Sequence, residues 1–270
     1  MLNILFLGEI VGRPGIQALK NGLGLIKNKY AVDYTIANVE GMTNGFGIGR
    51  AHSAQLEKLG VDLATGGEKL FYKIDMVEYL PKAQYILRGY NYPQKCPGRG
   101  YKIVTLNDRK FLIANLVGNA DMKASIQNAF LSAESLLKKK EEEDLLLIVQ
   151  FHASTTAEKN TMFHMLDGKA VAVIGTHTKV ISADAHVSEK GTAYISDNGR
   201  VGSFLSVGGF DSQTEIRKFL TALPLRSKEC WDEGIIEGVV VKIDEKEGKS
   251  VEIIPILEKV GIKCPGGKEN

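Results

Sequence analysis

Five short apolar runs in this chain each end in glycine, an acidic residue or a histidine, and this pattern most constrains its fold. Each run has the length and composition of a buried strand. The acids and histidines that follow the runs are Glu9, Glu40, Glu68, His152 and His177. In α/β sheets, the carboxyl ends of parallel strands form the edge where ligands bind. The pattern therefore predicts an α/β protein with a mixed carboxylate and imidazole site, a donor set that suits Mn, Fe or Zn.

Segments with helical periodicity alternate with the early strands, whereas the later part of the chain is richer in hairpins. This order favours a mixed sheet, or two packed sheets, with helices outside. Helices are expected at 16–29, 50–59, 70–80, 125–140, 156–165 and 211–220, and a tight loop at 8–15. No repeat or linker is visible, so we expect a single domain over residues 1–270.

The charge and composition exclude several classes of protein. The 34 basic and 32 acidic residues leave a net charge of +2, which gives no strong signal for nucleic acid or an anionic membrane. No apolar run approaches the ~20 residues of a membrane span. The N-terminus lacks a basic signal-peptide region, and the three cysteines form no CxxC motif. We therefore expect a cytoplasmic protein with free thiols.

Six motifs resemble those of the YmdB-like bacterial metallophosphoesterases, which belong to the calcineurin-like superfamily. In chain order they are GEIVGRPG, NVEGMTNGFGI, TGGEK, FHASTTAEK, GTHTKVISAD and KGTAYISDNG, and the resemblance runs from Met1 to about Leu257. It implies a four-layer α/β/β/α sandwich. It also implies a two-metal phosphodiesterase that acts on cyclic nucleotides such as 2′,3′-cyclic AMP. A homo-oligomer is compatible with the resemblance, although no stretch of the chain encodes one.

The chain departs from the family's motifs at five of the eight positions that matter. The family's GD is Gly8-Glu9 here, and its N-x-E-N ends in Gly41. Its GNH is replaced by Gly66-Gly67-Glu68, and its GTHTH ends in Lys179. The Asn ligands are thus lost at 41 and 67 with no evident substitute, which favours reduced activity.

The residues that remain imply an altered metal site. Glu40, His152 and His177 match three of the four ligands of one metal, and Glu9 is a candidate ligand for the other. Lys179 falls at a ligand position of that second metal, and a protonated lysine has no lone pair to offer. We therefore expect one divalent ion (Mn, Fe or Zn), with two ions or none as the alternatives.

Two further residues are candidates for the reaction itself. Glu68 could replace the missing histidine as proton donor if its pKa is raised. Lys179 could neutralise charge on the phosphate. It could also place its ammonium where the second ion would sit, paired with Glu9 and Glu40. Asp184 and Asp197 match family positions and are candidates for orienting loops.

Two functions follow from these departures. The first is a working phosphodiesterase with an altered metal site. The second is a catalytically inactive homologue that binds a nucleotide or a protein partner.

Overall fold

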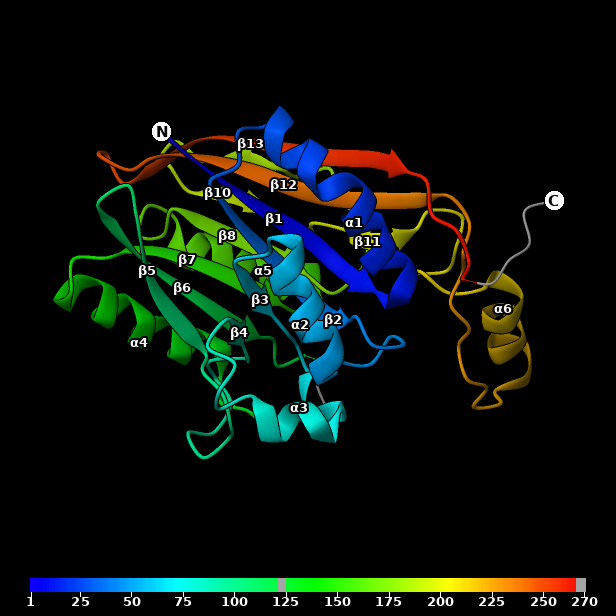
Figure 1. Ribbon diagram of the computed structural model, residues 1–270. Helices are drawn as coiled ribbons and strands as arrows, with labels where there is room; N and C mark the ends of the chain where they lie inside the picture. Colours follow the sequence, from blue (N-terminus) through cyan, green and yellow to red (C-terminus); the bar gives the residue numbers. More distant parts are fainter. Residues whose placement is uncertain (121–124, 266–270) are drawn as a thin grey trace.

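Two β-sheets stack face to face at the centre of the protein, and helices cover their outer faces (Figure 1). The structure is a computed structural model that describes residues 1–120 and 125–265. The arrangement confirms the α/β class and the four-layer α/β/β/α sandwich. The candidate residues lie on or after strands of both sheets. The site therefore forms where the edges of two sheets meet, and not along the edge of a single sheet.

The first sheet has seven strands. In spatial order they are β13 (Lys249–Val260), β12 (Gly234–Asp244), β11 (Arg200–Ser203), β1 (Leu2–Val11), β2 (Tyr34–Gly41), β3 (Leu63–Thr65) and β4 (Ile86–Leu87). β1 is central, running parallel to β2 and β11 and antiparallel to β12. The pairing of β1 with β2 is irregular on both sides of Glu9. Such bulges locally redirect a side chain.

The second sheet has six strands. In spatial order they are β5 (Tyr101–Leu106), β6 (Arg109–Val117), β7 (Leu146–His152), β8 (Ala172–Thr176), β10 (Ala193–Ile195) and β9 (His186–Val187). The central strands are parallel and the two edge strands are antiparallel. β5 and β6 form a hairpin, and its turn residues Asn107 and Asp108 have φ values of +45° and +63°.

Three apolar cores separate the layers, and β1 shows how one strand serves two of them. Leu5 and Leu7 pack under the helices of the first sheet, whereas Ile4 and Phe6 face the second sheet. This is the two-residue alternation of a strand covered on both faces. The third core lies between the second sheet and its own helices.

The helices are divided between the two outer faces. The first sheet is covered by α1 (Gly12–Lys29), α2 (Arg50–Leu59), the 3₁₀ turn η1 (Leu70–Tyr72) and α3 (Ile74–Tyr79), and the second by α4 (Ala129–Glu142) and α5 (Thr156–Leu166). The last helix, α6 (Ser212–Thr221), stands away from the sheets (Figure 1), and none of its residues is buried. Within the described residues, no helix is long and apolar enough to cross a bilayer.

Some expected boundaries differ from the structure. The loop expected at 8–15 is wrong, because β1 continues to Val11 and α1 begins at Gly12. The helix expected at 125–140 begins at Ala129, because the Asn128 side chain accepts hydrogen bonds from the backbone N–H groups of Phe130 and Leu131 and caps it. The pattern missed β11, which is short and begins with an arginine.

A buried ion pair ties α5 to the loop between β10 and β11. The Lys159 Nζ lies 3.0 Å from Asp197 Oδ2, and both side chains are almost fully buried. Asp197 also accepts hydrogen bonds from the backbone N–H groups of Thr178 and Gly199. The expected loop-orienting role of Asp197 therefore has a physical basis in these contacts.

Replacing Lys159 with methionine should destabilise the protein strongly. Lys159→Met leaves the buried Asp197 carboxylate without its cation, and breaking such a pair costs about 3–5 kcal/mol. Chemical denaturation measures the change. The matched control is Lys58→Met on exposed α2 surface, which we expect to change stability by less than about 0.5 kcal/mol. Equal stability of the two variants would contradict this assignment.

Candidate active site

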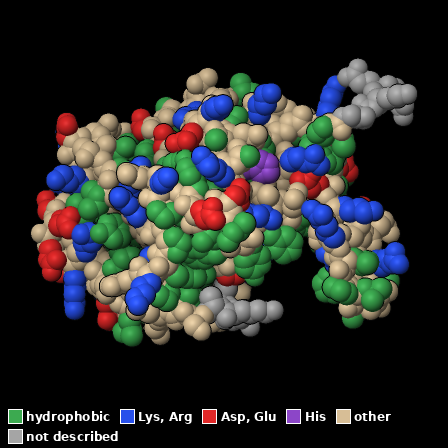
Figure 2. Space-filling view, turned by 60° about the horizontal axis from the view of Figure 1, so that its bottom comes forward, with side chains coloured by type: hydrophobic (Ala, Val, Ile, Leu, Met, Phe, Trp, Pro, Cys, Tyr) green, Lys and Arg blue, Asp and Glu red, His purple; other side chains and the backbone are tan. Residues whose placement is uncertain are grey.

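The candidate residues come together where the carboxyl ends of strands from both sheets meet. Glu9 lies near the end of β1, Glu40 is the penultimate residue of β2, and Glu68 follows β3. His152 ends β7, and His177 comes directly after β8. On the face drawn in Figure 2, a histidine side chain is exposed between basic and acidic side chains.

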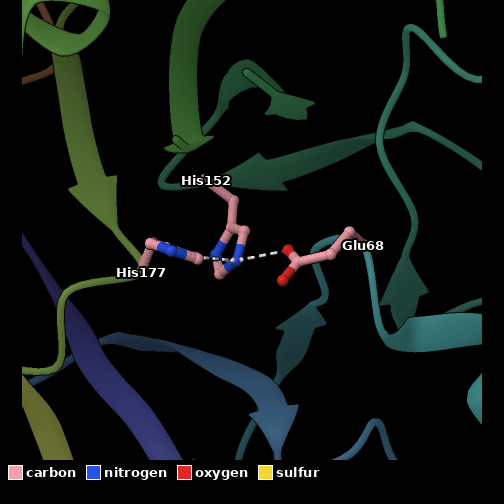
Figure 3. A group of neighbouring side chains, drawn as sticks. All are labelled: Glu68, His152 and His177. Carbon is pink, nitrogen blue, oxygen red and sulfur yellow. Dashed lines mark hydrogen bonds and ion pairs between the residues drawn. The ribbon is translucent and has the colours of Figure 1, made fainter. Parts of the chain in front are cut away.

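Glu68, His152 and His177 form the tightest group, here called the ligand triad. Glu68 Oε2 lies 3.0 Å from His152 Nε2, and His177 Nδ1 lies 3.1 Å from the same nitrogen. Figure 3 shows the three side chains converging from a loop and two strand ends. One ligand atom from each residue lies within 4.8 Å of the others, which is close enough for the three to share one ion.

Within the ligand triad, His152 is held in position by contacts at its other ring nitrogen. It is fully buried, and its Nδ1 lies 2.9 Å from Thr176 Oγ1 and 3.3 Å from Asn38 Nδ2. Because the Asn38 amide N–H can only donate, Nδ1 is the acceptor and the Nε2–H points at Glu68, at the position that an ion would take. A hydrogen bond behind a histidine ligand commonly fixes its tautomer in this way.

His177 is neutral and is held in an unusual backbone conformation. Burial, with repulsion from His152 and nearby lysines, lowers the pKa of His177 to about 4. Its φ is +113°, a region that non-glycine residues rarely adopt. Lys179, two residues later, has a φ of +63°. Such strain persists only where the surrounding structure imposes it, and it is frequent at functional sites.

Glu68 is ionised in this environment. Burial alone would raise its pKa, but the hydrogen bond and charge of His152, with the Lys69 ammonium, hold it well below its usual range. The proposed role of Glu68 as proton donor required a raised pKa, and the structure shows the opposite shift. A lowered pKa suits a metal-ligating carboxylate.

Glu40 is fully buried and already satisfied by the backbone. Its carboxylate accepts hydrogen bonds from the backbone N–H groups of Gly67 (2.5 Å) and Lys69. Burial and the charges of Glu68 and Glu9 raise its pKa well above its usual value, against the effect of those two bonds. Glu40 thus lies beside the ligand triad and fixes the loop that carries Glu68. Its role as a ligand stays a prediction.

Glu9 has a lysine as its partner. The Lys179 Nζ lies 3.3 Å from Glu9 Oε1, and Glu9 is only 1% exposed. Neither Glu9 oxygen accepts a hydrogen bond from the described residues, and the Lys179 ammonium is its ion-pair partner. The expected Lys179–Glu9 pair is therefore present, whereas Glu40 forms its bonds with the backbone.

Lys69 brings a second ammonium to the three carboxylates of Glu9, Glu40 and Glu68, here called the carboxylate cluster. Its Nζ lies 3.4 Å from Glu68 Oε1. Burial alone would lower the pKa of Lys69, but the carboxylate cluster outweighs it and raises that pKa. The strand-end pattern does not indicate Lys69, although this residue stands in the TGGEK motif beside Glu68.

The glycines at 41 and 67 make room for neighbouring side chains. A Cβ at Gly41 would lie 2.5 Å from Glu9 Oε1, so the longer acid at 9 fills the space that a side chain at 41 would need. A Cβ at Gly67 would lie 2.2 Å from the His152 ring. The residues at 9 and 41 are therefore sterically linked, and the loss of the Asn ligand at 41 stays a prediction.

These contacts decide which metals the residues could hold. The ligand triad offers two imidazole nitrogens and one carboxylate oxygen, a set that fits one Zn, Mn or Fe ion. Glu68 Oε2 faces the His152 Nε2 at 3.0 Å, so these two donor atoms point at the same place. Where the family resemblance implies a second ion, the Lys179 ammonium lies 3.3 Å from Glu9 Oε1, and an ammonium has no lone pair to offer a metal.

The fold and the site place the chain in the class of metallophosphoesterase-like proteins. The family model described as "YmdB-like protein" matches residues 5–256. The chain belongs to this family.

Its relatives support a phosphoesterase function. The chain is 33% identical over 256 residues to the Bacillus subtilis 2′,3′-cyclic-nucleotide 2′-phosphodiesterase, covering 95% of this chain and 97% of the relative. It is 36% identical over 228 residues to a Mycoplasma genitalium protein named as a phosphatase/phosphodiesterase, covering 82% and 80%. The crystal structure of a Mycoplasma pneumoniae phosphatase matches with a TM-score of 0.89 at 31% identity, covering 96% and 93%.

A side chain at position 41 should be tolerated only when residue 9 is shortened. Gly41→Asn alone displaces the Glu9 carboxylate from Lys179, and we expect it to destabilise the protein by about 1–3 kcal/mol. Adding Glu9→Asp should recover part of that loss. Denaturation of both single variants and the double variant gives the coupling energy, which we expect to exceed about 0.5 kcal/mol. Strict additivity would show that the two positions are independent.

The positive φ of His177 should be visible in stability. His177→Gly and His177→Ala both remove the imidazole, but only alanine keeps the backbone strain. We expect the glycine variant to be more stable than the alanine variant by about 1 kcal/mol. Thermal or chemical denaturation measures the difference, and an alanine variant as stable as the glycine variant would contradict the strained conformation.

Proposed function

We propose that this chain is a phosphodiesterase of the cyclic-nucleotide class that uses one divalent ion, held by Glu68, His152 and His177. The single observation that carries the proposal is the convergence of three ligand atoms from these residues. The names of the relatives support the substrate class. Glu68 thus takes a ligand position in this proposal, beside the two histidines that the motifs already indicated.

An ion held there would supply Lewis-acid polarisation of the phosphoryl group and of the attacking water. The chain's own lysines would supply the other positive charges at the phosphate. Lys179 and Lys69 have partly exposed side chains, at 20% and 23%, so their ammonium groups can donate to phosphate oxygens as well as to the carboxylate cluster. Each would neutralise negative charge on the phosphate as it develops in the transition state.

A second candidate function is binding of a nucleotide without hydrolysis. The Lys179–Glu9 pair favours it, because the ammonium stands beside an acid where the family resemblance implies a second ion. Two-metal sites place their ions about 3.5–4 Å apart to clamp both reacting oxygens. A chain with one ion could still bind a nucleotide, but it would lack the second of the two ions that clamp the reacting oxygens.

Metal content and turnover distinguish the two candidates. After purification without chelator and loading with Mn or Zn, we expect about one ion per chain by elemental analysis and slow hydrolysis of 2′,3′-cyclic AMP. Glu68→Gln and His177→Ala should lose the ion, and their hydrolysis should fall by about 100-fold or more. Lys179→Met should keep the ion but lose turnover, and the matched control Lys20→Met on exposed surface should change neither.

Other outcomes are equally informative. Two ions per chain would contradict the assignment of Lys179. One ion with tight nucleotide binding and no turnover would favour the second candidate. Unchanged metal content in Glu68→Gln would show that Glu68 is not a ligand.

A further inference from the structure

A cavity of about 700 Å³ lies beside the loop that follows β4. It is bounded by this loop, by β5 and by the beginning of α4. Its volume falls in the range of pockets that hold small organic ligands. None of the residues assigned above to metal or phosphate lines it.

The cavity is positively charged. Its lining includes the cationic side chains of Arg88, Arg99 and Lys102, and no aspartate or glutamate of the described chain lines it. Among the described residues, no ion pair joins any of these three cations to a carboxylate. Their charge is therefore available to an anion.

Arg88 is the most informative of these residues. It is only 7% exposed, and its Nη1 donates to the carbonyl oxygen of Gly89 at 2.7 Å. Its Nε is buried and has no partner in the described chain, and the buried Tyr92 hydroxyl on the same cavity also lacks one. Burial lowers the pKa of Arg88, yet a guanidinium stays charged in proteins. A buried charge without a counter-ion is costly, and a bound anion would relieve that cost.

Aromatic rings line the cavity together with the cations. Tyr90 and Tyr101 are partly buried and meet edge to face, with ring centroids 5.8 Å apart. Tyrosine rings offer flat surfaces on which a base can stack. The cavity therefore combines a phosphate-type anchor with a base-type platform.

Asn91 holds the walls of this cavity in place. Its side chain donates to the carbonyl oxygens of Val117 and Gln127, and its Oδ1 accepts from the Val117 N–H. The backbone N–H of Gln127 returns a bond to the Asn91 carbonyl oxygen. These bonds join the loop to β6 and to the segment before α4, so the cavity is preformed. A preformed site loses less free energy to ordering when it binds.

We propose that this cavity is a second ligand site, which binds a mononucleoside phosphate with its phosphate on Arg88 and its base against Tyr90 and Tyr101. Arg99 and Lys102 add charge at the mouth of the cavity. The proposal does not depend on the ligand triad or on hydrolysis.

Calorimetric titration of the full chain with AMP, adenosine and inorganic phosphate tests the site. We expect AMP to bind more tightly than either fragment. Arg88→Gln should weaken AMP and phosphate by about 10- to 100-fold, because a charged hydrogen-bond donor is lost. If Arg88→Gln does not fold, the double variant Arg99→Gln/Lys102→Gln on the outer part of the cavity carries the test. The exposed control Lys95→Gln should bind AMP like the unmodified chain.

Several results would overturn the proposal. One is the absence of AMP binding at millimolar concentration. Another is adenosine binding as tightly as AMP, which would remove the role of Arg88. Loss of AMP binding in His177→Ala with full binding in Arg88→Gln would place the nucleotide at the ligand triad.

Discussion

This site depends on one constraint: its buried carboxylates must be compensated by ammonium and backbone N–H groups of the chain itself. Glu9 and Glu40 are almost fully buried at the ends of two neighbouring strands, where unpaired charge would be strongly destabilising. Glu9 is paired with the Lys179 ammonium, and Glu40 with two backbone N–H groups of the loop after β3. The same backbone bonds fix the loop that presents Glu68 to His152 and His177. The contacts that compensate the buried carboxylates therefore also fix the geometry of the ligand triad.

The departures from the family's motifs form a connected set. The longer acid at 9 reaches both the space above Gly41 and the ammonium of Lys179. The His152 ring lies against Gly67, and a charged Glu68 lies against His152. A count of missing ligands describes these positions as separate losses. The contacts show that these altered residues pack against one another or against residues that the motifs keep.

Much of the fold was visible in the sequence, because buried strands and amphipathic helices leave strong periodic patterns. The edges of elements were less certain where a local interaction decided them, as with the Asn128 cap that delays α4. The strand-end pattern correctly indicated which acids and histidines would come together. It could not show that Glu40 would be satisfied by backbone N–H groups, or that Lys69 would join the cluster. Those contacts depend on loop conformation, and no pattern in the chain encodes it.

The ammonium beside Glu9 also determines how the site depends on its surroundings. A metal ion is taken from solution, so its occupancy varies with supply, competition and chelation. Lys179 belongs to the chain itself, so its ammonium accompanies Glu9 whatever the supply of metal. Part of the positive charge at this site is therefore fixed by the amino-acid sequence.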